Sequence, residues 1–242
     1  MRLALVHARL QVVELVRFPG FSIATLGLPA FFFLLFGLPR AHVAPKLFLA
    51  SYAGLAVLGI GFFQFGVSMA IERAAPWSVW VRTLPASAFA RITGRVLAGL
   101  VFATASATIV VAIALATTPA WPGALGLARL AATLVVGSVP FVAFGLAIAY
   151  WTSPKSALPV ANVLYILLAY VGGLWGSRSD LPHLVMALSP YTPTRQWGDL
   201  LWAAVTAGRI GFVHWLALAG YAALFGLAAA WGYRRDEGQR FR

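Results

Sequence analysis

The sequence predicts an all-α fold: a polytopic membrane protein with six transmembrane helices in one domain, residues 1–242. Three observations carry this prediction. Of the 242 residues, 61% are hydrophobic and only 10% are charged. The mean hydropathy is +0.86, whereas a soluble domain carries roughly 25% charged residues to cover its surface. Six apolar stretches are each long enough to cross the hydrocarbon core as a helix of about 20 residues, so most of the surface is expected to face lipid.

Short polar connections separate the six predicted spans. Prolines at positions 119 and 122 mark a tight turn at residues 119–124, and another tight turn is expected at 152–155. Pro29, Pro140 and Pro159 lie inside spans, where each removes one helical hydrogen bond. The predicted spans are residues 20–38, 47–71, 94–118, 125–151, 156–176 and 212–233.

The distribution of positive charge predicts the orientation. If the N-terminus is inside, twelve of the 18 Lys and Arg residues fall in cytoplasmic segments and six on the external side. Cytoplasmic loops carry the excess of Lys and Arg, so we expect both termini in the cytoplasm. The net charge of +12 is therefore assigned to membrane orientation, and no nucleic-acid partner is expected. The bias toward Arg, Ala and Gly is typical of a GC-rich bacterial genome, which indicates the bacterial cytoplasmic (inner) membrane.

The first segment outside the spans, residues 1–19, is predicted to be an interfacial helix. On a helical wheel its polar side chains form one stripe, which comprises His7, Gln11, Glu14 and Arg17. Such a stripe opposite an apolar side is typical of a helix that lies at the membrane surface. A frayed tail is the alternative.

The second segment, residues 72–95, is the longest and most charged internal loop. Pro76 is suited to the first position of a short helix, and Pro85 would end that helix. The apolar side of this helix would consist of Trp77, Trp80 and Val81. From the residues alone, a helix that rests on lipid headgroups explains the loop equally well.

The third segment, residues 177–211, is too long for a turn and too amphipathic for a span. One apolar helical face is expected in it, formed by Trp197, Leu200, Leu201, Ala204 and Val205. Pro190 and Pro193 separate this face from a short apolar run at 181–188. We therefore predict two half-helices that re-enter the outer leaflet, with an ordinary interfacial helix as the alternative.

The polar chemistry of the spans is sparse. None of the six acidic residues lies near the middle of a span, so proton or sodium coupling is not expected. Phe62, Gln64, Tyr165 and Tyr170 are candidates to line the path of an amphipathic substrate. Contact of these aromatic side chains with lipid is the alternative.

No catalytic or metal site is assigned. Asp180, His183, Asp199 and His214 are metal-ligand types that could meet on the outer side, but their spacing matches no known pattern. Solvated interfacial residues are the expected outcome there. The sequence also lacks a phosphate-binding G-x-x-x-x-G-K-[ST] loop, so another chain would have to supply energy for uphill transport.

The order of these elements resembles the permease subunits of ABC exporters of the second exporter type, which include bacterial drug, antibiotic, polysaccharide and teichoic-acid exporters. The most specific match is Glu72-Arg73 followed by the segment 82–87, which reads Arg-Thr-Leu-Pro-Ala-Ser. Family members often carry an acidic–basic pair, a short helix and a leucine–proline–small–serine turn here. One departure is the segment 74–76, Ala-Ala-Pro, where many members have a glycine.

This resemblance implies that the loop 72–95 is a coupling helix that docks into a groove of an ATP-binding subunit. Trp77, Trp80 and Val81 would then make apolar contacts, and Pro85 would end the helix. The implied charged contacts are Glu72, Arg73, Arg82 and Arg91. The resemblance also implies two ATP-binding subunits, which would hold ATP and Mg, and a second permease chain, identical or closely related.

The chain itself would then bind no cofactor and would not be an enzyme. It would export a hydrophobic or amphipathic compound such as a drug, antibiotic, peptide natural product or lipid. A stand-alone facilitator, channel or interaction subunit without an ATPase is the alternative. A membrane-embedded enzyme comes third, since acidic residues are scarce and the spans contain no buried His paired with a Ser or an acid.

Overall fold

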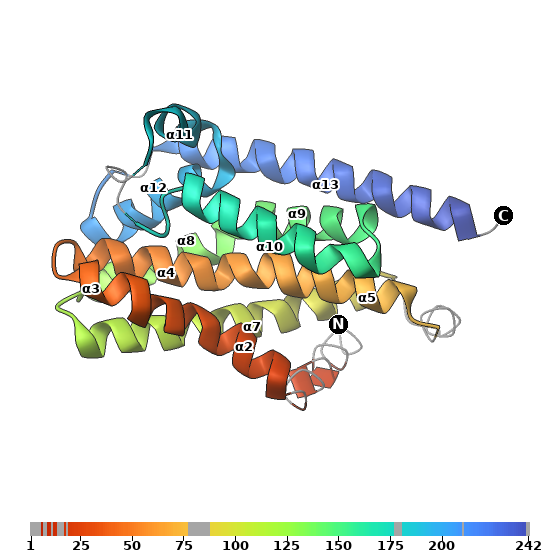
Figure 1. The fold of residues 1–242 in the computed structure, drawn as a ribbon, viewed down its shortest axis with the longest axis horizontal. Coiled ribbons are helices and arrows are strands. Elements are labelled where there is room, and N and C mark those ends of the chain that lie inside the picture. The colour runs from red at the N-terminus through yellow and green to blue at the C-terminus, as the bar shows by residue number, and fades with distance from the viewer. Residues whose placement is uncertain are drawn as a thin grey trace.

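The computed structural model of this chain is a bundle of long helices whose axes are roughly aligned (Figure 1). It describes residues 19–76, 88–176, 181–209 and 211–240, and a few positions between 6 and 17. In the long ranges, side chains are not described at 19–24, 88–93 and 237–240. Every described element is a helix, as the composition predicts. Most of the predicted interfacial helix at residues 1–19 lies outside the described residues.

Five described helices are long and apolar enough to cross a membrane. They are Pro45–Ala74, Gly94–Thr117, Ala124–Trp151, Pro154–Val171 and Phe212–Asp236. The predicted first span belongs to an unbroken helical run, composed of α2 (Pro19–Phe32), the π-helix η1 (Phe33–Gly37) and α3 (Leu38–Ala41). Its described apolar part, Thr25–Ala41, is shorter than the other five. The structure thus supports a multi-span membrane protein, and the count of six stays a prediction.

The second span forms the core of the bundle. It consists of α4 (Pro45–Gly59), the π-helix η2 (Ile60–Ser68) and α5 (Met69–Ala74), joined end to end. Its most apolar window is 72% buried, compared with 11% for the last span. A π-helix of nine residues is unusual, because such helices mostly occur as single turns and often mark functional positions.

Both predicted tight turns are confirmed. α7 (Ala88–Thr117) and α8 (Ala124–Gly137) are joined by residues 118–123, where Gly123 adopts a φ of 82°. α9 (Val139–Trp151) is followed after two residues by α10 (Pro154–Val171), and the Ser153 hydroxyl caps α10 by accepting from the backbone N–H of Ser156. The predicted span 125–151 is therefore two helices that meet at Ser138, just before Pro140.

Two helix ends differ from the prediction. α10 ends at Val171, earlier than expected, because the two following glycines end it and Gly173 adopts a φ of 73°. The last helix, α13 (Phe212–Arg240), instead continues past the expected end at residue 233. Figure 1 shows that it runs along the whole bundle.

α9 packs directly against η2 through glycine. A Cβ atom built on Gly145 would lie 1.9 Å from the carbonyl oxygen of Gly61. A Cβ atom on Gly61 would in turn lie 3.1 Å from backbone atoms of Phe141. The two backbones are therefore in contact, and this seam fixes the fourth span against the second.

The bundle has two distinct ends (Figure 1). The loop end carries the end of α5, the turn 152–153 and the C-terminal part of α13. The opposite end, which we name the α12 end, carries α11 (His183–Leu188), the 3₁₀ helix η4 (Ser189–Tyr191) and α12 (Pro193–Thr206). Thr192 caps α12 by accepting from the backbone N–H of Arg195.

Candidate functional site

Arg73 is the centre of a polar cluster at the loop end. Its guanidinium forms an ion pair with Asp236 of α13. Its Nε donates to the carbonyl oxygen of Ala149 at 2.9 Å, and its Nη2 donates to that of Thr152 at 2.8 Å. The guanidinium also lies over the ring of Tyr150, 5.9 Å from the centroid. One side chain thus ties the end of the second span to both α9 and α13.

A second ion pair joins the two flanks of the loop 72–95. Glu72, in α5, pairs with Arg95 of α7. The Arg95 Nη1 also donates to the sulfur of Met69 at 2.9 Å. Because residues 72 and 95 stand on either side of the loop, this pair closes the loop at its base.

The residues expected to couple the loop to a partner therefore fall into two groups. Glu72 and Arg73 have partners inside the chain, and the Arg73 side chain is only 13% exposed. Trp77, Trp80, Val81, Arg82 and Pro85 lie outside the described residues, as does the side chain of Arg91. The role of these six in coupling stays a prediction, whereas Glu72 and Arg73 hold the base of the loop.

The predicted apolar face of α12 is confirmed. All five of its residues are buried: Trp197, Leu200, Leu201, Ala204 and Val205. The indole N–H of Trp197 donates to the carbonyl oxygen of Thr133 at 3.0 Å, and its ring lies 4.9 Å from that of Phe141. Gly137 makes room for this indole, since a Cβ atom there would lie 2.2 Å from the indole nitrogen.

The two prolines of this region have different surroundings. Pro193 is buried at the start of α12, whereas Pro190 is exposed in η4 and its carbonyl oxygen accepts from the side chain of Gln196. The short helices on either side match the two predicted half-helices in position. Their depth in the bilayer stays a prediction.

Sequence reasoning did not identify the polar network of α12. Arg195 is 8% exposed and forms an ion pair with Asp199 at 2.9 Å. Its guanidinium lies over Trp202, whose indole N–H donates to the Ser51 hydroxyl of α4 at 2.8 Å. The spacing of four between Arg195 and Asp199, inside an amphipathic helix, is a signal that would have predicted the ion pair.

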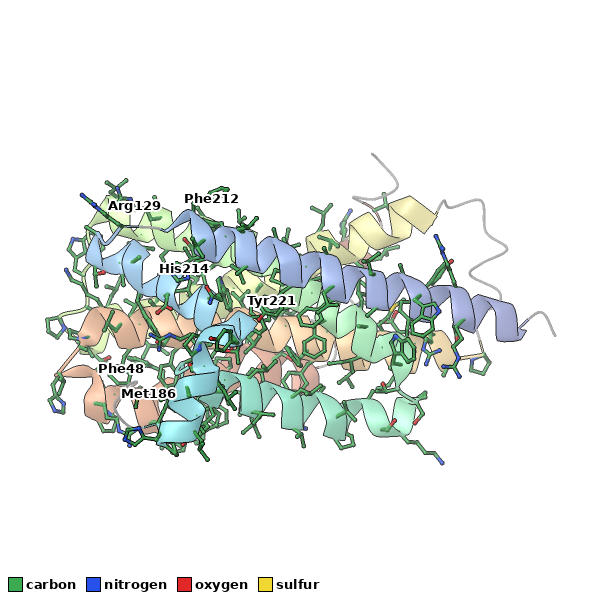
Figure 2. The ribbon with its side chains drawn as sticks, turned by 90° about the horizontal axis from the view of Figure 1, so that it is seen from above. Phe48, Arg129, Met186, Phe212, His214 and Tyr221 are labelled. Atoms are coloured by element: carbon green, nitrogen blue, oxygen red, sulfur yellow. The ribbon has the colours of Figure 1, made fainter. Side chains whose placement is uncertain are left out.

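α13 packs against one side of the α12 end. In Figure 2, His214 and Tyr221 project from α13 toward α12 and α11. The His214 Nδ1 lies 2.6 Å from the side-chain oxygen of Gln196, and the Tyr221 hydroxyl donates to the carbonyl oxygen of Tyr191. Within the described ranges, no group of three His, Cys, Asp or Glu residues could hold a metal ion. Asp180 lies outside these ranges.

Three of the four candidate path residues are buried in the core. Phe62 and Tyr165 are in contact, with ring centroids 6.4 Å apart, and the Tyr165 hydroxyl donates to the carbonyl oxygen of Leu55 at 3.3 Å. Gln64 is 4% exposed, and its side-chain oxygen has no hydrogen-bond partner among the described residues. Tyr170 is 41% exposed on α10 and does not join this cluster.

An apolar groove of about 230 Å³ lies between α4, α7 and α8. Its walls include Val57, Ala103, Ala107, Leu130 and Leu134, and none of the candidate path residues lines it. Alanines four residues apart on α7 leave this space open. A groove of this composition suits an aliphatic chain or the apolar part of a small molecule. The sequence contains no pattern that would have located it.

Comparison with known proteins gives one informative similarity. The chain matches no protein-family model. It is similar to "Putative transport permease YvfS" of Bacillus subtilis (strain 168), with 25% identity over 195 residues, which cover 78% of each protein. The region of similarity is long enough to include several of the five apolar helices.

Proposed function

We propose that this chain is the membrane-spanning permease subunit of an ATP-driven ABC exporter, which moves a hydrophobic or amphipathic compound out of the cytoplasm or the inner leaflet. The observation that carries this proposal is the construction of the loop end. The Glu72–Arg95 pair closes the loop, and Arg73 fastens its first flank to α9 and α13. Similarity to a protein named as a transport permease supports the same assignment.

A loop whose two flanks are held together by an ion pair can transmit a displacement to the helices on either side of it. A partner that pushes on residues 77–87 would move α5, because α5 directly precedes them. α5 continues the second span, which contacts α7, α9, α10 and α12. A displacement of the loop would therefore reach most of the bundle. In this account Trp77, Trp80, Val81, Arg82, Pro85 and Arg91 contact the partner, and Glu72 and Arg73 are positioning residues.

The partner in this account is an ATP-binding subunit. The chain has no phosphate-binding loop of its own, so ATP and Mg would bind to that subunit. Two copies of it and a second permease chain, identical or closely related, would complete the transporter. Closure of the two ATP-binding subunits would then move the two loops. The substrate site would thereby open alternately to the inside and to the outside of the membrane.

The apolar groove supports the proposed class of substrate. It is mostly lined by aliphatic side chains, with the hydroxyl groups of Thr104, Thr108 and Ser138 among them. A strongly charged solute would lose its hydration there without gaining an ion-pair partner. The groove is therefore a better candidate substrate site than the cluster of Phe62 and Tyr165, which is filled by its own side chains.

A stand-alone facilitator is the second candidate function, and one observation favours it. Glu72 and Arg73 both satisfy their charge within the chain. These two residues at the base of the loop therefore need no partner to neutralise them.

Photo-crosslinking distinguishes the two functions. A photoreactive phenylalanine analogue would replace Trp77 or Trp80 in the full chain, in cells of the source organism. The matched control replaces Trp121, which is 58% exposed in the turn at the α12 end. We expect adducts with an ATP-binding subunit from positions 77 and 80 only. Normal insertion of all three variants without any such adduct would favour the facilitator.

A further inference from the structure

A polar pocket of about 250 Å³ lies at the loop end, separate from the apolar groove. It is formed by the last residue of α9, the turn that follows it, and α13. The pocket includes Trp151, Thr152, Ser153, Gly232 and Arg235, with Arg73, Tyr150 and Asp236 completing its wall. Four candidate spans begin or end here, at Ala74, Trp151, Pro154 and Asp236. This position corresponds to the headgroup level of a bilayer, since the helices are apolar up to these residues.

The charge of the pocket is positive. Arg73 and Asp236 neutralise each other in an ion pair. Arg235 is exposed, and among the side chains that the structure describes, which end at Asp236 in this helix, no carboxylate lies within ion-pair distance of it. Its guanidinium lies over the ring of Trp151 at 5.7 Å. One arginine therefore supplies the net charge and is held at the wall by an aromatic ring.

Two tryptophans lie in contact beside Arg235, and one of them, Trp151, lines the pocket. The Trp151 indole N–H donates to the carbonyl oxygen of Ala228 at 2.9 Å, and the ring lies 4.8 Å from that of Trp231. Gly232 permits this contact, because a Cβ atom there would lie 2.8 Å from the indole nitrogen. Trp151 and Trp231 are 44% and 64% exposed. Exposed tryptophans at the ends of spans are typical of the membrane–water interface.

We propose that this pocket binds the phosphate of an anionic phospholipid headgroup in the leaflet that faces the loop end. Arg235 would pair with the phosphate, and the glycerol and first methylene groups would lie along Trp151 and Trp231. Arginine suits this ligand, because its planar guanidinium can contact two phosphate oxygens at once. The carboxylate of Asp236 lies in the wall, but its pairing with Arg73 limits repulsion of the phosphate. A lipid is favoured over a free anion because apolar, exposed aromatic surface borders the cation. The proposal does not depend on the exporter assignment.

Native mass spectrometry of the purified full chain tests this site. The chain in an uncharged detergent would be titrated with phosphatidylglycerol and, separately, with phosphatidylcholine of the same acyl chains. The test variant is Arg235→Ala. The matched control is Arg234→Ala, which removes the neighbouring exposed arginine that does not line the pocket. Arg235→Lys retains the charge without the planar group.

We expect the wild type to retain phosphatidylglycerol in preference to phosphatidylcholine. Arg235→Ala should weaken this binding about fivefold, as expected for the loss of one specific, partly exposed ion pair. Arg234→Ala should change it less than twofold, and Arg235→Lys should fall between the two. Equal weakening by Arg234→Ala and Arg235→Ala would indicate diffuse attraction and overturn the site. Competition by millimolar inorganic phosphate without lipid specificity would overturn the assignment to lipid, as would equal retention of the two lipids.

Discussion

The two ends of the bundle are stabilised differently, because ion pairs join separate helices at the loop end, whereas the Arg195–Asp199 pair of the α12 end lies within one helix. At the loop end, a partly exposed ion pair joins α5 to α7, and a mostly buried one joins α5 to α13. At the α12 end, fully buried side chains such as Trp197, Leu200 and Leu201 fill the space between α4 and α8. Partly exposed charges can exchange one partner for another at small cost, whereas buried aromatic packing cannot. The loop end is therefore suited to respond to a partner, and the α12 end to keep its arrangement.

The largest effect is expected at the α12 end. Trp197→Ala removes a side chain with no exposed surface, its hydrogen bond to Thr133 and its contact with Phe141. The variant should lose about 3–5 kcal/mol of unfolding free energy, measured by chemical unfolding in detergent. Trp121→Ala, an exposed tryptophan at the same end, is the control and should cost less than about 0.5 kcal/mol. Similar losses in both variants would contradict the assigned packing.

The seam between the second and fourth spans should give the next largest effect. Gly145→Ala places a Cβ atom against the carbonyl oxygen of Gly61, and a backbone atom cannot move aside as a flexible side chain can. We expect a loss of about 1–3 kcal/mol in the same unfolding assay. The matched control is Gly226→Ala in α13, where a Cβ atom would meet nothing within 4 Å. This variant should be neutral or slightly stabilising, because alanine favours helix more than glycine does.

Breaking the Arg73–Asp236 pair should have an effect no larger than that of the glycine seam. Either Arg73→Ala or Asp236→Asn should cost about 1–3 kcal/mol, since each leaves a mostly buried polar group without its partner. The double variant should cost less than the sum of the two single variants. Raising the salt concentration should change this coupling little, because a mostly buried pair is only weakly screened. Additive losses at low salt would show that the two side chains do not interact.

The smallest effect on stability is expected for the pair that closes the loop. Glu72→Gln removes a carboxylate that is 36% exposed, so the loss should be about 0.5 kcal/mol or less. If residues 77–87 act on a partner, the same variant should nevertheless lower partner-stimulated transport, because the base of the loop is no longer held. Transport measured in vesicles against Arg234→Ala as control would separate the two roles.

These comparisons also show what the sequence could and could not predict. Hydropathy along the chain and helical periodicity identified the five spans that the structure supports, the tight turns and the buried face around Trp197, because each depends on residues close together in the chain. The pairing of Arg73 with Asp236 joins residues 163 positions apart, and no local pattern encodes it. The apolar groove and the exposure of Tyr170 likewise depend on how neighbouring helices pack.

The most direct test of the central proposal is the composition of the complex. The full tagged chain would be extracted from its native membranes in a mild detergent, and the proteins that co-purify would be quantified by mass spectrometry. The exporter proposal predicts an ATP-binding subunit in near-equal amount with the permease, reduced when Trp77 and Trp80 are both replaced by alanine. An intact, monodisperse chain that reproducibly carries no such subunit would contradict the proposal and favour the stand-alone facilitator.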